Sequence, residues 1–259
     1  MDGAVAVVTG GGTGIGAAVV RKLAARGVRC VVNYASSRDE AEAVAGETGG
    51  IAVRGDVAAD ADCRALARAA VERWGRLDFL VNNAGRTKFA NHEDLEALEA
   101  DDFLDLYRVN TVSAFQMIRA CAPAMRDGGM GAVVNVASVA GVFGIGSSVA
   151  YACTKGAMIT LTKSLARVLA PAIRVNAVAP GYVGTGWFEK RLGEEGFARL
   201  NERIAGAVPM GFATGSDDVA GPIVHLLDPA SRAITGEVTL IDAGAHLDIG
   251  LSRRPGRDL

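Results

Sequence analysis

The chain has 259 residues, of which 50% are hydrophobic and 22% are charged, and its formal net charge at pH 7 is −2. This balance supplies a sizeable buried core and gives no electrostatic reason to expect binding to nucleic acid or to an anionic membrane. The four cysteines are scattered without Cys-x-x-Cys pairs or histidine partners, and no apolar run has the length of a membrane-spanning helix. We therefore expect a cytoplasmic protein with reduced thiols and no metal site.

A glycine-rich turn separates the first predicted strand, 4–9, from a predicted helix that continues to residue 26. Its glycines permit a tight turn, a close approach of backbone N–H groups to a pyrophosphate and close packing of helix on strand. Such a turn can be merely flexible, but its position between a strand and a helix favours a dinucleotide site. The predicted contacts are Gly10, Thr13, Gly14, Ile15 and Gly16.

The second predicted strand, 28–34, ends where an acidic residue would bind the ribose 2′-hydroxyl of NAD, and the sequence has no acidic residue there. Hydroxyls and a guanidinium follow instead, which suits a phosphate and favours NADP(H), with NAD(H) still possible. Alternatively, Ser36 caps the next helix and Arg38 points to water. The predicted contacts at this end of the cofactor are Tyr34, Ser36, Ser37 and Arg38.

Two further predicted strands, 51–57 and 77–81, end in Asp56-Val57 and in Asn82-Asn-Ala-Gly85. Small and amide residues at a strand end can let the adenosine half of a cofactor lie against the backbone, although turns of this type also occur without function. A helical stretch from residue 102 then carries Asn110 in an otherwise apolar face. A buried amide needs partners, so Asn110 either has a polar role or caps a break in the helix.

The fifth predicted strand, 131–138, brings Ser138 to its carboxyl end, and a predicted helix begins at Tyr151 and ends at Leu169. Tyr151 and Lys155 are four residues apart, so they share one face of that helix. The lysine charge would lower the pKa of the phenol and make it a general acid or base near neutral pH. The same spacing is commonplace on solvated helix faces, so the pair indicates a catalytic role only together with the other motifs of the chain.

The sixth predicted strand, 173–179, leads into the longest departure from the strand–helix rhythm, 181–215. This segment is apolar, helical in pattern and flanked by glycines, which are features of a substrate lid. A helix capped by Ser216 and a last strand, 238–241, follow it. We expect an apolar pocket beneath the lid, formed by Val139, Val142, Phe143, Trp187 and Phe188.

Seven strand signals that alternate with helices predict an α/β fold with a single doubly wound, Rossmann-type parallel sheet and helices on both faces. We expect residues 1–259 to form one domain, with its lid at about 181–215. The polar candidates then fall beyond the carboxyl ends of strands or at helix starts on the same edge, where open α/β sheets bind ligands.

In this order the motifs resemble those of the short-chain dehydrogenase/reductase family, nearly from end to end of the chain. The matching residues are Thr9-Gly-x-x-x-Gly-Ile-Gly16, Asp56, Asn82-Asn-Ala-Gly85, Asn110, Ser138, Tyr151-x-x-x-Lys155, and Pro180-Gly181 with Thr185. Two positions depart from the pattern of members that use NADPH. Thr13 stands where those members often have a basic residue, and the arginine that similar chains often carry near residue 36 lies at 38.

The resemblance implies a role for each of four residues. Tyr151 would give a proton to the carbonyl oxygen as hydride reaches the carbon, or take it in the reverse direction, and Ser138 would hold and polarise that oxygen. Lys155 would lower the pKa of the phenol and bind the nicotinamide ribose, while Asn110 would anchor a water between Lys155 and solvent. Further cofactor contacts implied beyond the strand ends are Asp56, Val57, Asn83, Ala84, Gly85, Pro180, Gly181, Val183 and Thr185.

Within the family, Asn33-Tyr-Ala35 and the run 234–244 resemble 3-oxoacyl-acyl-carrier-protein reductases, and such proteins are usually homotetramers. The resemblance favours an oxidoreductase that uses NADP(H) to reduce a 3-oxoacyl thioester or a similar small carbonyl. Two alternatives stay open: an NAD-dependent dehydrogenase of a sugar or other secondary alcohol, and a dinucleotide-binding regulator without chemistry. The intact set of Ser138, Tyr151, Lys155 and Asn110 argues against the regulator.

Overall fold

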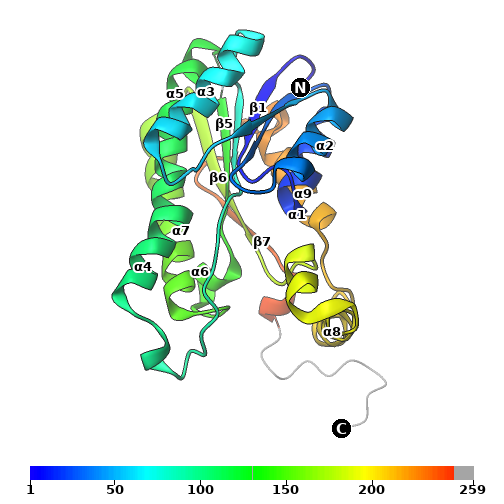
Figure 1. Ribbon diagram of the computed structural model, residues 1–259. Coiled ribbons are helices and arrows are strands. Elements are labelled where there is room, and N and C mark those ends of the chain that lie inside the picture. Colours follow the sequence, from blue (N-terminus) through cyan, green and yellow to red (C-terminus); the bar gives the residue numbers. More distant parts are fainter. Residues whose placement is uncertain (130, 248–259) are drawn as a thin grey trace.

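The computed structural model describes residues 1–129 and 131–247, which are built around one seven-stranded sheet (Figure 1). The strand order is β3-β2-β1-β4-β5-β6-β7, and every neighbouring pair is parallel. The strands are β1 Val5–Val8, β2 Arg29–Tyr34, β3 Ile51–Arg54, β4 Phe79–Asn82, β5 Gly131–Val136, β6 Ile173–Pro180 and β7 Val238–Ile241. The predicted doubly wound, Rossmann-type sheet is confirmed.

Helices cover both faces of the sheet (Figure 1). One face carries α1 Gly14–Ala24, α2 Arg38–Thr48 and α9 Ser216–Leu227, and the other carries α3 Asp60–Trp74, α5 Ser113–Asp127 and α7 Val149–Leu169. Three helices lie toward the carboxyl ends of the strands: α4 Ala100–Tyr107, α6 Val139–Phe143 and α8 Gly186–Ala207. Among the described residues, no helix combines the length and the apolar character that crossing a membrane requires.

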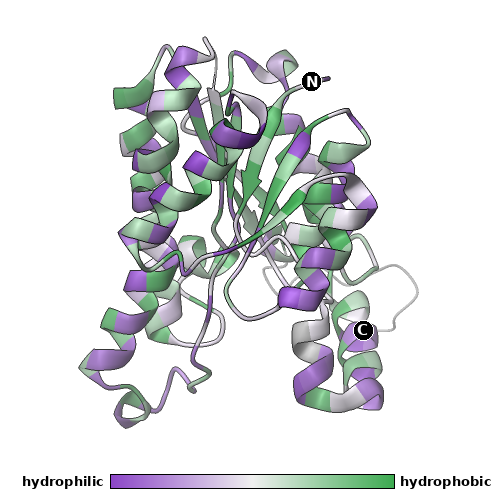
Figure 2. Ribbon diagram, turned by 45° about the horizontal axis from the view of Figure 1, so that its top comes forward, coloured by the Kyte–Doolittle hydropathy of each residue, from purple (hydrophilic) through white to green (hydrophobic). Residues whose placement is uncertain are grey.

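Strand β1, in the interior of the sheet, shows how the sheet is buried on both sides. Ala6 and Val8 belong to the apolar cluster under α1, α2 and α9, whereas Val5 and Val7 belong to the cluster under α3 and α5. All four side chains are fully buried. A parallel strand with helices on both faces reads as an uninterrupted apolar run, and the strands in Figure 2 are correspondingly hydrophobic while the helices show hydrophilic outer sides.

Two predicted helix boundaries and one predicted helix cap were wrong. The helix with Tyr151 begins two residues earlier, because the Ser148 hydroxyl caps it by accepting from the Tyr151 N–H at 3.2 Å. The helix expected from residue 102 consists of α4, a π-helical turn over 108–112, and α5. The cap of α9 is Gly215 rather than Ser216, and its N–H donates to the Asp218 carboxylate at 2.7 Å.

The strand order reverses direction between β1 and β4, so the chain leaves these neighbouring strands toward opposite faces of the sheet. This topological switch point opens a crevice at the carboxyl edge. The turn after β1, the loop after β4, helix α6 after β5 and the segment after β6 all lie at that edge (Figure 1). The fold therefore brings together the segments that carry most of the predicted site.

The contact between α6 and α7 is close because Gly141 has no side chain. A Cβ at Gly141 would lie 2.3 Å from the Lys155 carbonyl carbon and 2.5 Å from the Gly156 nitrogen. We expect Gly141→Ala to lower the free energy of unfolding by about 1–3 kcal/mol in urea titrations, through overpacking. The control is Gly46→Ala, because Gly46 lies in α2 with open space around its Cβ position. That change should instead stabilise by about 0.5–1 kcal/mol, and equal effects of the two variants would contradict the close contact.

Candidate active site

A cavity of about 1140 Å³ lies at the carboxyl edge of the sheet. Many of the predicted site residues line it, and they come from the turn after β1, the loop after β4, the end of β5, helix α7 and the segment after β6. These are Thr13, Ile15, Asn83, Gly85, Ser138, Tyr151, Lys155, Pro180, Gly181, Val183 and Thr185. Gly10, Gly14, Gly16, Tyr34, Ser36, Ser37, Arg38, Asp56, Val57, Ala84 and Asn110 do not line this cavity.

Ser138 and Tyr151 meet inside the cavity. Ser138 follows β5 and caps α6, where its Oγ accepts from the Ala140 N–H at 3.1 Å and lies 3.4 Å from the Pro180 carbonyl oxygen. A hydrogen bond also joins the Ser138 side chain to the Tyr151 phenol. Two hydroxyls from different elements thus converge on a space large enough for a small molecule, and both could bind one oxygen atom of it.

Lys155 lies beneath this pair as a buried cation. Its side chain is 4% exposed, and Nζ donates to the Val136 carbonyl oxygen at 2.8 Å. Nζ lies 5.7 Å from the centroid of the Tyr151 ring. Burial lowers the pKa of Lys155 to about 8, because the charged form loses its hydration.

The pKa of Tyr151 differs from the sequence-based expectation. Burial raises the pKa of the phenol above its ordinary value, and the hydrogen bond from Ser138 offsets only part of that shift. The expected lowering by Lys155 was wrong, because the desolvation of the phenolate dominates. The phenol is therefore protonated at neutral pH and suited to donating a proton.

Asn110 lies fully buried in the π-helical turn, and its amide already has protein partners at both ends. Its Oδ1 accepts from the Arg86 N–H at 2.9 Å, and its Nδ2 donates to the Arg86 carbonyl oxygen at 2.9 Å and to Thr154 Oγ1 at 3.0 Å. These bonds hold the loop after β4 beside Lys155, since a Cβ at Gly85 would lie 3.6 Å from Lys155 Nζ. The side chain of Asn110 thus positions this loop.

The turn after β1 has the features of an anion site. Gly10 and Gly14 have φ values of +60° and +51°, and a Cβ at Gly16 would lie 2.2 Å from the Gly10 carbonyl oxygen. The Thr13 side chain does not cap α1, and the first turn of α1 carries no acidic residue. The positive end of the helix is therefore left for a ligand, which fits the pyrophosphate of a dinucleotide.

Thr9, which sequence reasoning did not single out as a contact, ties this turn to the loop after β4. Its buried hydroxyl accepts from the N–H groups of Asn83 at 2.9 Å and Ala84 at 3.0 Å. Asn83 Nδ2 in turn donates to the Thr9 carbonyl oxygen at 2.9 Å. These hydrogen bonds fix the turn after β1 relative to the loop after β4.

The segment after β2 lies further from the cavity. Ser36 and Arg38 are exposed, and Ser37 precedes α2 without a side-chain capping bond. The alternative in which Ser36 caps α2 was therefore wrong, because Ser37 holds that position. Arg38 forms an ion pair with Glu42 at 2.7 Å.

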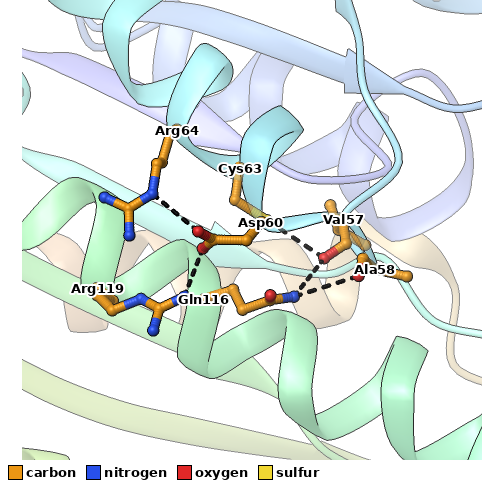
Figure 3. A network of polar contacts seen from close by, with 7 residues as sticks. All are labelled: Val57, Ala58, Asp60, Cys63, Arg64, Gln116 and Arg119. Carbon is orange, nitrogen blue, oxygen red and sulfur yellow. Dashed lines mark hydrogen bonds and ion pairs between the residues drawn. The ribbon is translucent and has the colours of Figure 1, made fainter.

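A second polar network supports the loop that contains Val57 (Figure 3). Gln116 Nε2 on α5 donates to the Val57 carbonyl oxygen at 3.3 Å and to the Ala58 carbonyl oxygen at 3.4 Å, and Cys63 Sγ donates to Val57 at 3.2 Å. Asp60 beside them accepts from Arg64 at 2.8 Å and from Arg119 at 2.5 Å. Sequence reasoning missed Gln116, because nothing in its local pattern connects α5 to a loop 59 residues away.

The apolar lining differs from the predicted one. Val139 lines the cavity, but Val142 and Phe143 lie outside it and are 42% and 48% exposed. They point outward because the chain after Ser138 forms the short helix α6 instead of continuing the strand. The side chains of Trp187 and Phe188 lie outside the described part of the structure. Apolar walls come instead from Phe89, Ile145, Leu192, Leu200 and Ile204.

Nowhere in residues 1–129 and 131–247 do three or more histidine, cysteine, aspartate or glutamate side chains form a cluster that could hold a metal ion.

Comparisons with known proteins cover nearly the whole chain. The family model described as "Enoyl-(Acyl carrier protein) reductase" matches residues 10–246. "Granaticin polyketide synthase putative ketoacyl reductase 2" of Streptomyces violaceoruber is 41% identical, over 94% of this chain and 96% of its own. The 3-oxoacyl-acyl-carrier-protein reductase FabG of Staphylococcus aureus (strain Mu50) is 34% identical, over 93% and 98%. A "putative short-chain dehydrogenase/reductase" of Burkholderia xenovorans has a crystal structure that superposes with a TM-score of 0.86 at 36% identity, over 94% and 98%.

The buried ammonium of Lys155 predicts a pH dependence of stability. Burial depresses its folded-state pKa from 10.5 to about 8, so the unfolded chain binds more protons between these values. The free energy of unfolding, measured relative to Lys155→Met, should therefore rise from pH 8 toward pH 10.5, by at most about 1.4 kcal/mol per pH unit. Lys163→Met, at an exposed position of the same helix, is the control for the substitution itself. A flat difference across this range would contradict the burial of the cation.

Proposed function

Because the chain belongs to the short-chain dehydrogenase/reductase family, we propose that it is an NADP(H)-dependent reductase of a 3-oxoacyl thioester or a similar carbonyl. The observation that carries this proposal is the hydrogen-bonded pair of Ser138 and Tyr151 in a cavity above the buried Lys155. The relatives named ketoacyl reductase and 3-oxoacyl-acyl-carrier-protein reductase support the substrate class.

Each polar group of the site has a task in this reaction. A nicotinamide cofactor held in this cavity would supply the hydride for the carbonyl carbon. Ser138 holds the carbonyl oxygen by a hydrogen bond, and the Tyr151 phenol gives that oxygen its proton as negative charge develops on it. Lys155 keeps N–H donors beyond the one bound to Val136, and these would bind the nicotinamide ribose. Thr185 and Val183 line the same cavity and would orient the carboxamide.

The protonation state of the site favours the reductive direction. A phenol whose pKa is raised by burial carries its proton at neutral pH, which reduction consumes. Oxidation of an alcohol would instead require the phenolate, whose burial is costly.

The phosphate of NADP(H) would lie beside the start of α2. No carboxylate occupies the end of β2 to repel it, since the strand closes in Asn33 and Tyr34. The Ser37 hydroxyl makes no capping bond, so it is free to donate to a phosphate oxygen. Arg38 would have to turn from Glu42, to which it is paired at 2.7 Å. That ion pair favours NAD(H), as does Thr13 in place of a basic residue, and both support the alternative of an NAD-dependent alcohol dehydrogenase.

The segment 181–215 would act as the substrate lid. Helix α8 in this segment carries Leu192, Leu200 and Ile204 into the cavity lining, and Gly193, with φ of 70°, breaks the helix into two arms. The lid belongs to the single domain that we propose for residues 1–259. A homotetramer completes the proposal, because α4, the π-helical turn and α5 leave large apolar side chains exposed: Phe103, Leu104, Tyr107, Val112 and Phe115. The relationship to FabG favours a cytoplasmic location.

Tyr151→Phe tests the proton transfer. The variant should lose about 10²–10⁴-fold in kcat for reduction of an acetoacetyl thioester, because the general acid is gone. Binding of NADPH, followed by its fluorescence, should persist, because the phenol contributes little to the binding of the cofactor. Tyr107→Phe is the control, because Tyr107 does not line the cavity and the substitution keeps the ring that the proposed tetramer would bury. Turnover near that of the wild type would refute the role of Tyr151.

Arg38→Gln tests the preference for the phosphate. We expect wild-type kcat/KM to be higher with NADPH than with NADH. In the variant the ratio of the two values should fall about tenfold, because the charge-assisted hydrogen bond to the phosphate is lost. Arg21→Gln removes a similar exposed ion pair, to Glu47, away from the cavity and serves as the control. A wild-type preference for NADH would favour the alternative dehydrogenase.

A further inference from the structure

The cavity has an unusual charge balance for a protein with a net charge of −2. Its lining includes Arg86, Lys155, Arg191 and Arg203 and, among the described residues, no aspartate or glutamate. Two of these cations have partners within the protein: Lys155 donates to the Val136 carbonyl oxygen, and Arg86 pairs with Asp105 at 3.4 Å. Arg191 and Arg203 take part in none of the ion pairs formed within residues 1–129 and 131–247.

Arg203 lies on the inner side of the lid helix. In the arm of α8 after Gly193, the residues that line the cavity are Leu200, Arg203 and Ile204, at spacings of three and four. This spacing defines one face of a helix, and that face is otherwise apolar. The charged residues of the same arm that do not line the cavity are Glu194, Glu195, Arg199 and Glu202, and Arg199 pairs with Glu195 at 3.3 Å. Arg203 is exposed, as these residues are, but it lies on the face of the helix that borders the cavity.

Arg191, in the other arm of α8, reaches across to the loop after β4. Its guanidinium carbon lies 3.8 Å from the centroid of the Phe89 ring, and both residues line the cavity. A guanidinium that lies over an aromatic ring keeps the N–H groups at its edge available. Two N–H groups along that edge can bind a carboxylate or a phosphate through two parallel hydrogen bonds.

We infer that Arg191 and Arg203 form an anion-binding subsite of the lid, which selects ketones that carry a phosphate or a carboxylate away from the reacting carbonyl. This inference rests on the proposed function, because it names the substrate class of the same site. The cofactor does not need these arginines, since the start of α1 and the segment after β2 offer its phosphates separate positions. Apolar walls from Ile145, Leu192 and Leu200 would accept the chain between the ketone and the anion.

Two matched pairs of substrates separate the two sources of negative charge. Acetoacetyl phosphopantetheine and acetoacetyl pantetheine differ only in the phosphate, while levulinate and methyl levulinate differ in the carboxylate. For each pair, the ratio of kcat/KM for the anionic to the neutral ketone is measured in the wild type, Arg191→Gln, Arg203→Gln and the double variant. The matched control is Arg199→Gln, on the same arm but outside the cavity lining.

We expect each single variant to lower the ratio about tenfold for at least one pair, the effect of losing one charge-assisted hydrogen bond. Arg203→Lys should restore part of the ratio, and added NaCl should lower it in the wild type. The pair that responds identifies the anion. Ratios that match those of Arg199→Gln for both pairs would overturn the inference, as would an equal weakening of NADPH binding, which would assign the arginines to the cofactor.

Binding without turnover separates this inference from the proposed function. If the wild type reduced none of the four ketones, the proposed reductase activity would fail. The subsite would then be judged by calorimetry with phosphopantetheine and levulinate, which require no chemistry. Weaker binding of one of them to Arg203→Gln than to Arg199→Gln would sustain the subsite, and equal binding of both would end it.

Discussion

The hydrogen bond from the buried Lys155 ammonium to the Val136 carbonyl oxygen, 2.8 Å long, is the contact on which the geometry of the site depends. It fixes α7 against the carboxyl end of β5, from which Ser138 emerges two residues later. Because Tyr151 lies one helical turn before Lys155, the same contact places the phenol beside the Ser138 hydroxyl. A buried lysine is costly to hold charged, and the lowered pKa of about 8 expresses that cost.

The remainder of the site divides into a base and the segment proposed as a lid. The base consists of strand ends and loops joined by buried polar bonds, of which Thr9 with Asn83 and Asn110 with Arg86 are the clearest. A preorganised base suits a reaction in which a proton donor and an oxygen-binding group must meet one carbonyl. If the proposed lid selects the substrate through Arg191 and Arg203, substrate selection and proton transfer reside in different elements of the fold.

Much of this arrangement could be predicted from the sequence, because periodicity and turn chemistry are local. Seven apolar strand signals were sufficient for the parallel sheet, and the glycines of the turn after β1 predicted a backbone suited to an anion, with positive φ at Gly10 and Gly14. The π-helical turn around Asn110 was not predictable, since it depends on the partners Arg86 and Thr154 from distant segments. The direction of the Tyr151 pKa shift was also missed, because burial depends on the packed fold rather than on the spacing to Lys155.

The central claim is that the site transfers hydride directly from one face of a bound nicotinamide to a carbonyl carbon, whose oxygen Ser138 and Tyr151 bind. It is tested most directly by incubating the protein with acetoacetyl pantetheine and NADPH deuterated at one face of the reactive ring carbon, followed by NMR of the product. The account predicts deuterium on the new hydroxyl-bearing carbon from one face of the ring and none from the other. A product without deuterium from either face would contradict it.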